Sequence, residues 1–274
     1  MRQLGKVFID RCRAGLEPAP MAITVQSICR HPVKGLSPET LEAAQIAPGA
    51  GLPDDRRFAL ARPATQFDTQ APRWLPKTSF YMLMRDERLA ALTTRFDETA
   101  GLLSISRSGR EVAKGRITEP LGRAIVEDFF AAYLGAAAGG KPRLIEAPSG
   151  HMFSDHQDPV LSLINLASVR DLERIVGAPV DPLRLRANLY VDGAPAWAEF
   201  GWLGGEIAIG TARLRVTARI DRCAATNVDP ATGARDMNIP KALKRGFGHV
   251  DCGVYAAVVT GGGIAVGDAL EPPH

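Results

Sequence analysis

Short stretches in which apolar and polar residues alternate dominate the chain and predict a strand-rich fold. Residues 22–29 have this pattern, and residues 80–118 contain further short apolar pieces that we expect to be strands of one small β domain. Residues 205–210 and 212–218 predict a hairpin, whose second strand leads towards a cysteine, Cys223. The chain then ends in two more predicted strands around a glycine-rich turn.

Two stretches have the period of a helix instead. In residues 119–135, Leu121, Ile125, Phe129 and Tyr133 fall four apart, a neighbouring row follows at 126, 130 and 134, and Gly135 is a suitable C-cap. We expect an amphipathic helix with its aromatic residues in the core. Residues 164–177 predict a second, structural helix, with Ser168 and Asp171 as a capping box and Gly177 at its end.

Residues 181–193 return to the alternating pattern of a strand. Arg184 and Arg186 would then lie on one face of that strand, because successive side chains of a strand point to opposite sides. Protection of a sheet edge against aggregation and recognition of an anion both explain such a pair.

Composition narrows the class of protein without defining it. The 274 residues are 46% hydrophobic and 23% charged, as in ordinary globular proteins. A net charge of +3 gives no support to a nucleic-acid partner, and no apolar run is long enough to span a bilayer. The four cysteines, at 12, 29, 223 and 252, have no metal-cluster spacing, so we expect reduced thiols in a cytoplasmic protein and a buried Cys252.

Cys223 stands out because of the residues around it. It follows a basic residue, Arg222, which would favour the ionised thiol, and it precedes the turn-forming residues 228–233, VDPATG. The cysteine should therefore lie where a strand leaves the sheet and becomes a loop, although a lone cysteine is more often a small buried apolar residue.

The whole string RCAATNVDPATG, residues 222–233, resembles the signature of the MOSC domain family. MOSC domains occur at the C-terminus of molybdenum-cofactor sulfurases and in the mitochondrial amidoxime-reducing component. The resemblance implies that Cys223 either ligates molybdenum or handles sulfur for it. It extends over about residues 22–272 and is strongest at 184–233.

The same resemblance implies residues that bind an anionic pterin cofactor. HPVKG, residues 31–35, is similar to the family's YPVKS segment, so Lys34 and Gly35 are expected there, Lys34 on a turn at a strand end. Arg56 matches an Asp-Arg-aromatic motif, with Arg57 as the alternative and ion pairs to Asp54 and Asp55 as the structural explanation. A following segment resembles TQR..P, so Gln70 and Arg73 are weaker candidates.

The densest polar cluster is HMFSDHQDPV, residues 151–160. Its two histidines and two aspartates lack the spacing of known zinc motifs, so we do not expect a dedicated metal site. The cluster resembles the family's "SD…P" loop, which implies a role at the cofactor for Ser154 and a catalytic role for Asp155. RAN at 186–188 resembles the family's "FRPN" strand, implying Arg186 and Asn188, and the signature implies Arg222.

The predicted fold class is therefore a β-rich α+β protein of two domains. We expect an extension over residues 1–21, loose or disordered, in which a targeting helix is disfavoured by Asp10 and Glu17. A MOSC N-terminal β-barrel-like domain would follow over 22–145 and a MOSC β-barrel domain over 146–272, with the cofactor between them.

Three functions remain open at this point. The resemblance implies an oxidoreductase that uses a molybdenum cofactor (Mo-molybdopterin), with Cys223 as metal ligand, to reduce N-hydroxylated small molecules. Electrons would come from a separate ferredoxin-like or flavin reductase partner, since the cysteines cannot hold an iron–sulfur cluster. The alternatives are a sulfur carrier with a persulfide on Cys223 and a non-enzymatic cofactor-binding module. We expect a monomer with no nucleic-acid or membrane partner.

Overall fold

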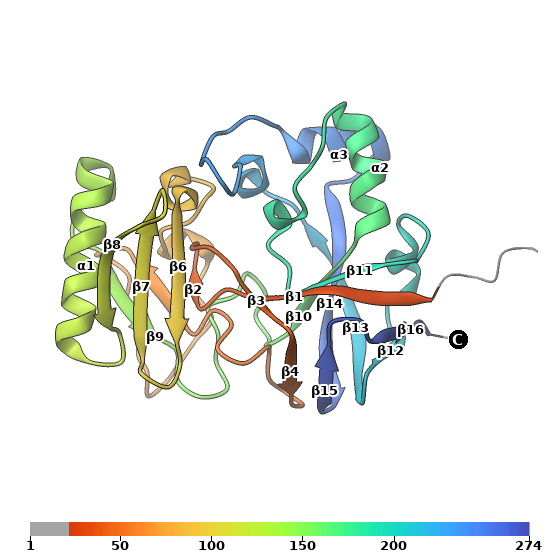
Figure 1. Cartoon of the computed structure of the whole chain (residues 1–274), viewed down its shortest axis with the longest axis horizontal. Helices are drawn as coiled ribbons and strands as arrows, with labels where there is room; N and C mark the ends of the chain where they lie inside the picture. Colours follow the sequence, from red (N-terminus) through yellow and green to blue (C-terminus); the bar gives the residue numbers. More distant parts are fainter. Residues whose placement is uncertain (1–21, 274) are drawn as a thin grey trace, which may run out of the picture.

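A computed structural model describes residues 22–273 of the chain, so the expected extension over residues 1–21 lies outside the described residues. Two strand-rich parts lie side by side (Figure 1). One carries helix α1 on its outer face, and the other carries helices α2 and α3. The helices are α1 (Pro120–Leu134), α2 (Leu166–Val176) and α3 (Ile239–Phe247).

Seven strands close into a barrel, which confirms the β-rich fold class. The closure depends on β1, which pairs with β16 on one side and antiparallel with β11 on the other. Around the barrel the order is β11 (Leu189–Asp192), β10 (Leu161–Asn165), β14 (Asp251–Thr260), β13 (Ala212–Asp221), β12 (Glu206–Ile209), β16 (Ala269–Glu271) and β1 (Ile23–Arg30).

The alternation of β13 shows why the sequence forms this barrel. Leu214 and Val216 are completely buried, whereas Arg213 and Arg215 between them are exposed. Leu214 and Val216 pack with buried residues of the other barrel strands into one continuous apolar core. The predicted hairpin is confirmed as β12 and β13, with Ile207 opposite Leu214.

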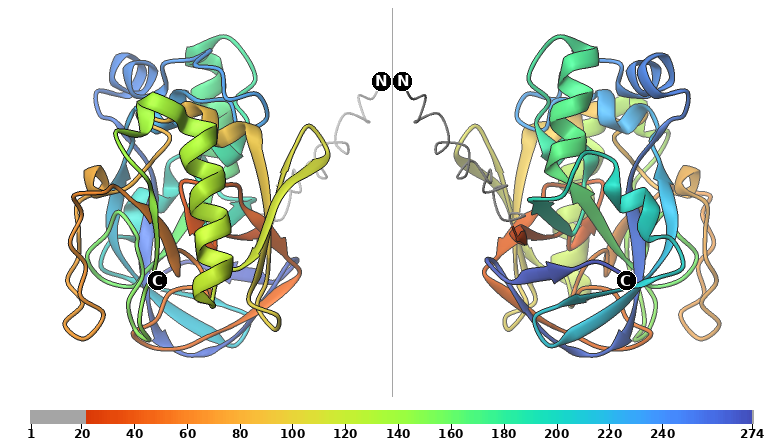
Figure 2. Two further views of the ribbon diagram at one scale, coloured as in Figure 1. Left: turned by 90° about the vertical axis from the view of Figure 1, so that its left-hand side faces the viewer. Right: turned by 90° about the vertical axis from the view of Figure 1, so that its right-hand side faces the viewer.

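The remaining strands form smaller sheets beside the barrel, apart from β3 (Glu39–Leu41), which extends the barrel sheet by pairing with β1. An antiparallel meander of β6, β7 and β8 is covered by α1, which Figure 2 shows running along its outer face. These strands are β6 (Leu92–Asp97), β7 (Leu102–Arg107) and β8 (Arg110–Arg116). The others are β2 (Val33–Lys34), β4 (Ala43–Ile46), β5 (Phe58–Ala61), β9 (Arg143–Glu146) and β15 (Gly262–Ala265).

The sheet pairing crosses the expected domain boundary near residue 145. β1 comes from the N-terminal segment, yet it completes the barrel whose other six strands lie after residue 160. β4 likewise pairs with β15 near the C-terminus. The division into domains at residue 145 stays a prediction, but the barrel itself is built from both sides of it.

Three local predictions were wrong in detail. Residues 182–185 form a 3₁₀ turn rather than a strand, because Asp181 caps it and Pro182 occupies its first position. Arg184 and Arg186 therefore do not share a strand face. The cap of α2 is Asn165 and not Ser168, whose hydroxyl instead donates to the buried Glu199.

The buried side of α1 is also narrower than its sequence indicates. Val126, Phe130 and Leu134 are buried, whereas Leu121 is 74% exposed. Of the expected row four apart, only Phe129 and Tyr133 pack against the core, and they do so partly buried. The neighbouring row is the one that faces β8.

Two identical substitutions in α1 test this assignment. We expect Leu134→Ala to lower the free energy of unfolding by about 2–5 kcal/mol, because it deletes buried methyl groups and leaves a cavity. The matched control Leu121→Ala should change it by about 0.5 kcal/mol or less. Urea unfolding of both variants measures the difference, and equal losses would contradict the assigned face.

Candidate functional site

A cavity of 590 Å³ lies where the barrel meets the N-terminal segment. It brings together residues from seven separate stretches of the sequence, and all nine predicted site residues line it. These are Lys34, Gly35, Arg56, Ser154, Asp155, Arg186, Asn188, Arg222 and Cys223. Their convergence is a feature of the fold, whereas their roles stay predictions.

Cys223 lies just beyond the end of β13, as its sequence context predicts. Its backbone is extended, its side chain is half-buried, and its carbonyl accepts hydrogen bonds from Thr226 through the amide (3.1 Å) and the hydroxyl (2.9 Å). The thiol is therefore held at the start of the turn η6 (Ala224–Asn227), on the wall of the cavity.

Two arginines fix the loop that follows this cysteine. Arg184, which is 3% exposed, donates to Asp229 (3.1 Å) and Asp236 (2.8 Å) and so ties the loop to the barrel. Arg235 reaches the other way, to the carbonyl of Leu83 (2.9 Å) and to Glu87 (3.0 Å). The loop of residues 228–236, which contains the VDPATG turn, is thus hydrogen-bonded to both parts of the molecule.

Arg222 does not direct its charge at Cys223. Its guanidinium donates to the carbonyls of Cys252 (2.8 Å from Nε) and Leu185 (2.8 Å from Nη1). These bonds connect β14 to the turn before β11. The hydrogen bonds of Arg222 thus go to backbone carbonyls, and its influence on the thiol stays a prediction.

The cation beside Cys223 is Lys77, which the sequence analysis missed. Burial lowers the pKa of Lys77, but its interactions with Cys223, Asp155 and Asp221 outweigh this effect and leave that pKa raised. Lys77 comes from the segment in which Gln70 and Arg73 were the candidates, and neither of those lines the cavity. A lysine at the start of a short 3₁₀ turn carries no signal in a single sequence.

Lys34 and Asp155 form an ion pair in the same cavity. The buried Lys34 Nζ lies 2.5 Å from Asp155 Oδ1 and donates to the carbonyl of Phe153 at 3.0 Å. Burial raises the pKa of Asp155, but the attraction of Lys34, Lys77 and Arg56 outweighs this and lowers the pKa below its ordinary value. Asp155 is therefore a carboxylate at neutral pH, and it cannot be a proton donor there.

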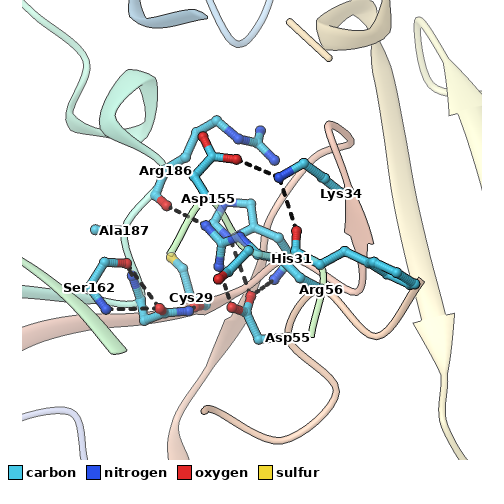
Figure 3. Close-up of polar contacts among 12 residues, drawn as sticks. Cys29, His31, Lys34, Asp55, Arg56, Asp155, Ser162, Arg186 and Ala187 are labelled. Atoms are coloured by element: carbon cyan, nitrogen blue, oxygen red, sulfur yellow. Dashed lines mark hydrogen bonds and ion pairs between the residues drawn. The ribbon is translucent and has the colours of Figure 1, made fainter. Parts of the chain in front are cut away.

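Two arginines with positive φ, Arg56 and Arg186, line the cavity, and Figure 3 shows their polar contacts. Arg56 pairs with the buried Asp55, and its Nη2 donates to the carbonyl of Arg186 at 3.0 Å. Arg186 makes one side-chain hydrogen bond, to the carbonyl of Leu36 (2.8 Å). Within residues 22–273 no carboxylate lies at ion-pair distance from Arg186.

The electrostatics of Arg186 are unusual for this reason. Loss of hydrating water, followed by repulsion from Arg56, lowers the pKa of Arg186 to about 10. Arg186 is still charged at neutral pH, but no carboxylate of the described residues forms an ion pair with it. An anion in the cavity would supply one. Arg57, the alternative to Arg56, instead pairs with Glu146 (2.6 Å) at a second cavity of 750 Å³.

The other predicted site residues use polar atoms in hydrogen bonds, or make close contacts, within the protein itself. Asn188 accepts from the amide (3.0 Å) and hydroxyl (2.9 Å) of Ser162, and its Nδ2 donates to the carbonyl of Cys29 (3.1 Å). It thus joins β10 and β1. The Ser154 hydroxyl donates to the carbonyl of His156 (2.6 Å), and Gly35, with φ of 86°, lies close to the carbonyl of Tyr81.

Two features are absent from the described residues, a cluster of metal ligands and a membrane-spanning helix. Residues 22–273 contain no group of three or more His, Cys, Asp or Glu side chains arranged to hold a metal ion. In the same part of the chain no helix is long and apolar enough to cross a membrane. Cys223 is the soft donor on the cavity wall, and the basic residues around it suit an anion.

Comparison with known proteins agrees with this arrangement. Residues 148–271 match the family model of the MOSC domain, so the chain contains a MOSC domain. MOSC domains form a family involved in molybdenum-cofactor binding and sulfuration. No match was found among curated proteins, and similarity to the amidoxime-reducing component stays a prediction.

Several solved structures are similar at low sequence identity. The YuaD protein of Bacillus subtilis shares 12% identity over 91% of this chain and 94% of its own, with a TM-score of 0.43. YiiM of Geobacillus stearothermophilus shares 22% identity over 42% of this chain and 54% of its own, with a TM-score of 0.33. A hypothetical protein shares 21% identity over 41% and 50%, with a TM-score of 0.30.

Replacement of Lys77 tests the cation beside the thiol. We expect Lys77→Met to slow alkylation of Cys223 by iodoacetamide at neutral pH by about 3- to 10-fold, because a neighbouring cation favours the reactive thiolate. Mass spectrometry of the Cys223 peptide measures the rate, since Cys29 and Cys252 are buried. Lys114→Met, on exposed β8, is the control. A rate unchanged in Lys77→Met would contradict the assignment.

The buried imidazole of His31, which lies next to Asp55, gives a prediction for the pH dependence of stability. Burial, and repulsion from Arg186, lower the pKa of His31 to about 3, from 6.5. The unfolded chain therefore takes up a proton in this window and the folded chain does not, so stability falls as pH falls from 6.5 towards 3.

His31→Phe should remove this component. The slope of the free energy of unfolding against pH should drop by up to about 1.4 kcal/mol per pH unit between about pH 6 and pH 4.5. Urea unfolding at a series of pH values measures both slopes. An identical slope in the variant would show that His31 does not stay neutral in the folded state.

Proposed function

We propose that this protein binds a molybdenum cofactor in the cavity and reduces N-hydroxylated small molecules, with electrons from a separate redox partner. The observation that carries the proposal is that one cavity contains both a cation suited to bind an anion and a thiol suited to bind a metal. Among the described residues no carboxylate pairs with the charge of Arg186, and the Cys223 thiol places a soft donor atom in the wall of the same cavity.

A molybdopterin would match both the cation and the thiol, since it is an anionic phosphate ester that carries a thiolate-bound metal. Arg186 and Lys34 would hold its phosphate side, and Cys223 would ligate the molybdenum. When bound, the cofactor supplies the two-electron chemistry that breaks an N–O bond. Arg56 supports Arg186, because its own hydrogen bonds go to Asp55 and to the Arg186 carbonyl.

The chain's own residues organise the rest of the reaction. Asp155 stays ionised, keeps Lys34 in place and can accept a hydrogen bond from a substrate N–H. Lys77 keeps a positive charge beside Cys223. Arg235 donates a hydrogen bond to the carbonyl of Met84 and so holds this segment of the cavity wall next to the Cys223 loop, which keeps the cavity in shape.

The electron donor belongs to the proposal as well. The four cysteines of the chain have no iron–sulfur cluster spacing. This supports delivery of electrons by a ferredoxin-like protein or a flavin reductase. The protein itself is proposed to act as a monomer in the cytoplasm.

A sulfur carrier is the second candidate, and Lys77 is the observation that favours it. A half-buried thiol beside a lysine is suited to carry a persulfide as well as to bind a metal. Sulfur would then have to come from a separate desulfurase. A persulfide on Cys223 in protein without molybdenum would support this second function.

The first test is the cofactor content of protein purified from a host that makes the cofactor. Wild type should contain about one molybdenum and one pterin per chain. Cys223→Ser should lose molybdenum, because the metal loses a protein ligand, and Arg186→Gln should lose pterin. Arg213→Gln, an exposed arginine on β13, is the matched control and should keep both. Wild type without either component would contradict the proposal.

Activity is tested with a chemical reductant and benzamidoxime. Loaded wild type should form benzamidine, and Cys223→Ser should lose about 100-fold or more of the rate, the scale expected when a group that organises the reacting centre is removed. Loaded protein without benzamidine formation would leave a cofactor-binding module and remove the reductase function.

A further inference from the structure

The loop that contains Ser154 and Asp155 also places a histidine, His156, in the wall of the Cys223 cavity. Its backbone is held by Ser154, whose hydroxyl lies 2.6 Å from the His156 carbonyl and 3.1 Å from the His156 amide. Its ring packs at an angle on Tyr255, with the ring centroids 5.0 Å apart. Backbone and ring are thus both fixed before any ligand binds.

The two ring nitrogens have different surroundings. Nδ1 lies 3.1 Å from the amide nitrogen of Asp158 and 3.2 Å from its carbonyl oxygen. One peptide neighbour therefore satisfies Nδ1 whether or not that nitrogen carries a proton. Nε2 has no hydrogen-bond partner among residues 22–273.

We propose that His156 is the proton donor of the reduction, through Nε2. This inference rests on the proposed function. While Nδ1–H stays on the Asp158 carbonyl, Nε2 can release a proton and regain one without a change of ring orientation. An imidazole that cycles between its two states needs such an arrangement, and a merely structural histidine does not.

The reaction requires protons, and neither Asp155 nor Tyr255 releases one readily at neutral pH. Reduction of an amidoxime breaks the N–O bond, takes two electrons from the reduced redox partner and two protons, and yields an amidine and water. His156 gives one proton to the departing oxygen, and solvent supplies the other and restores His156. Asp155 holds no proton at neutral pH, and burial raises the pKa of Tyr255.

The charged groups around His156 agree with this role. Asp155 precedes it in the loop, and Asp158 contributes its backbone. Tyr255 packs on its ring, and the same cavity contains the cations Lys34 and Lys77, which Asp155 partly neutralises. No element places a carboxylate at ion-pair distance from the His156 ring among the described residues.

The first experiment measures contact without turnover. Cofactor-loaded protein labelled with ¹⁵N-histidine is titrated with benzamidoxime in the absence of any electron donor. We expect the ¹⁵N shift of His156 Nε2 to change while that of Nδ1 stays nearly constant. Binding of benzamidoxime, seen by calorimetry, without a change at Nε2 would overturn the inference.

The second experiment compares two histidines of one loop. His156→Gln should reduce the rate of benzamidoxime reduction by about 10²–10⁴-fold at unchanged molybdenum content. His151→Gln is the matched control, since His151 lines the other cavity, and it should keep the wild-type rate within about 3-fold.

The outcomes separate the inference from the function on which it rests. Wild type that reduces benzamidoxime while His156→Gln reduces it equally fast would overturn the role of His156 alone. Loaded wild type that does not reduce benzamidoxime would overturn the reductase function, and the role of His156 with it. A loss in His156→Gln with a response at Nε2 supports both.

Discussion

The site depends on one unfavourable interaction, the electrostatic repulsion between Arg56 and Arg186. Arg56 donates to the carbonyl of Arg186, and its positive charge helps to lower the pKa of Arg186 to about 10. Asp55 neutralises Arg56, whereas Arg186 has no carboxylate at ion-pair distance within residues 22–273. Such a group has a standing affinity for an anion, because binding one restores the electrostatic energy that dehydration removed.

Barrel closure is what brings these groups together. In the antiparallel pairing of β1 with β11, Ile28 lies opposite Leu189, so the residues after β1 and those before β11 meet at one end of the barrel. Lys34 and Arg186 reach the cavity from there. Asp221 of β13 lies opposite Asp251 of β14, and Cys223 follows directly. Three segments distant in sequence thus meet through strand register.

Much of this could be predicted from the sequence, because the patterns are local. The hairpin of β12 and β13, the position of Cys223 after a strand and the helix α1 all follow from short-range periodicity. The MOSC resemblance also named nine residues that do line one cavity. It could not say which of them have free polar atoms. Asn188 and Arg222 are used up in structural bonds, and only the folded chain shows this.

Other features could not be found because their signal is tertiary. The 3₁₀ turn at 182–185 is different, because its signals, the cap at Asp181 and the neighbouring proline, are local, and the strand-like alternation of the segment obscured them. Lys77 and His156 are ordinary residues in sequence and gain meaning from the cavity wall they share with Cys223. The participation of β1 in the barrel likewise depends on pairing between residues more than 160 positions apart.

The central claim is that Cys223 is a metal ligand in a cavity shaped for an anion. X-ray absorption at the molybdenum edge tests it most directly, on wild type and on Cys223→Ser that has been reconstituted with an excess of the cofactor. The account predicts one sulfur neighbour fewer around molybdenum in the variant. The same number of sulfur neighbours in both proteins would show that Cys223 does not bind the metal, and the thiol would then need another explanation.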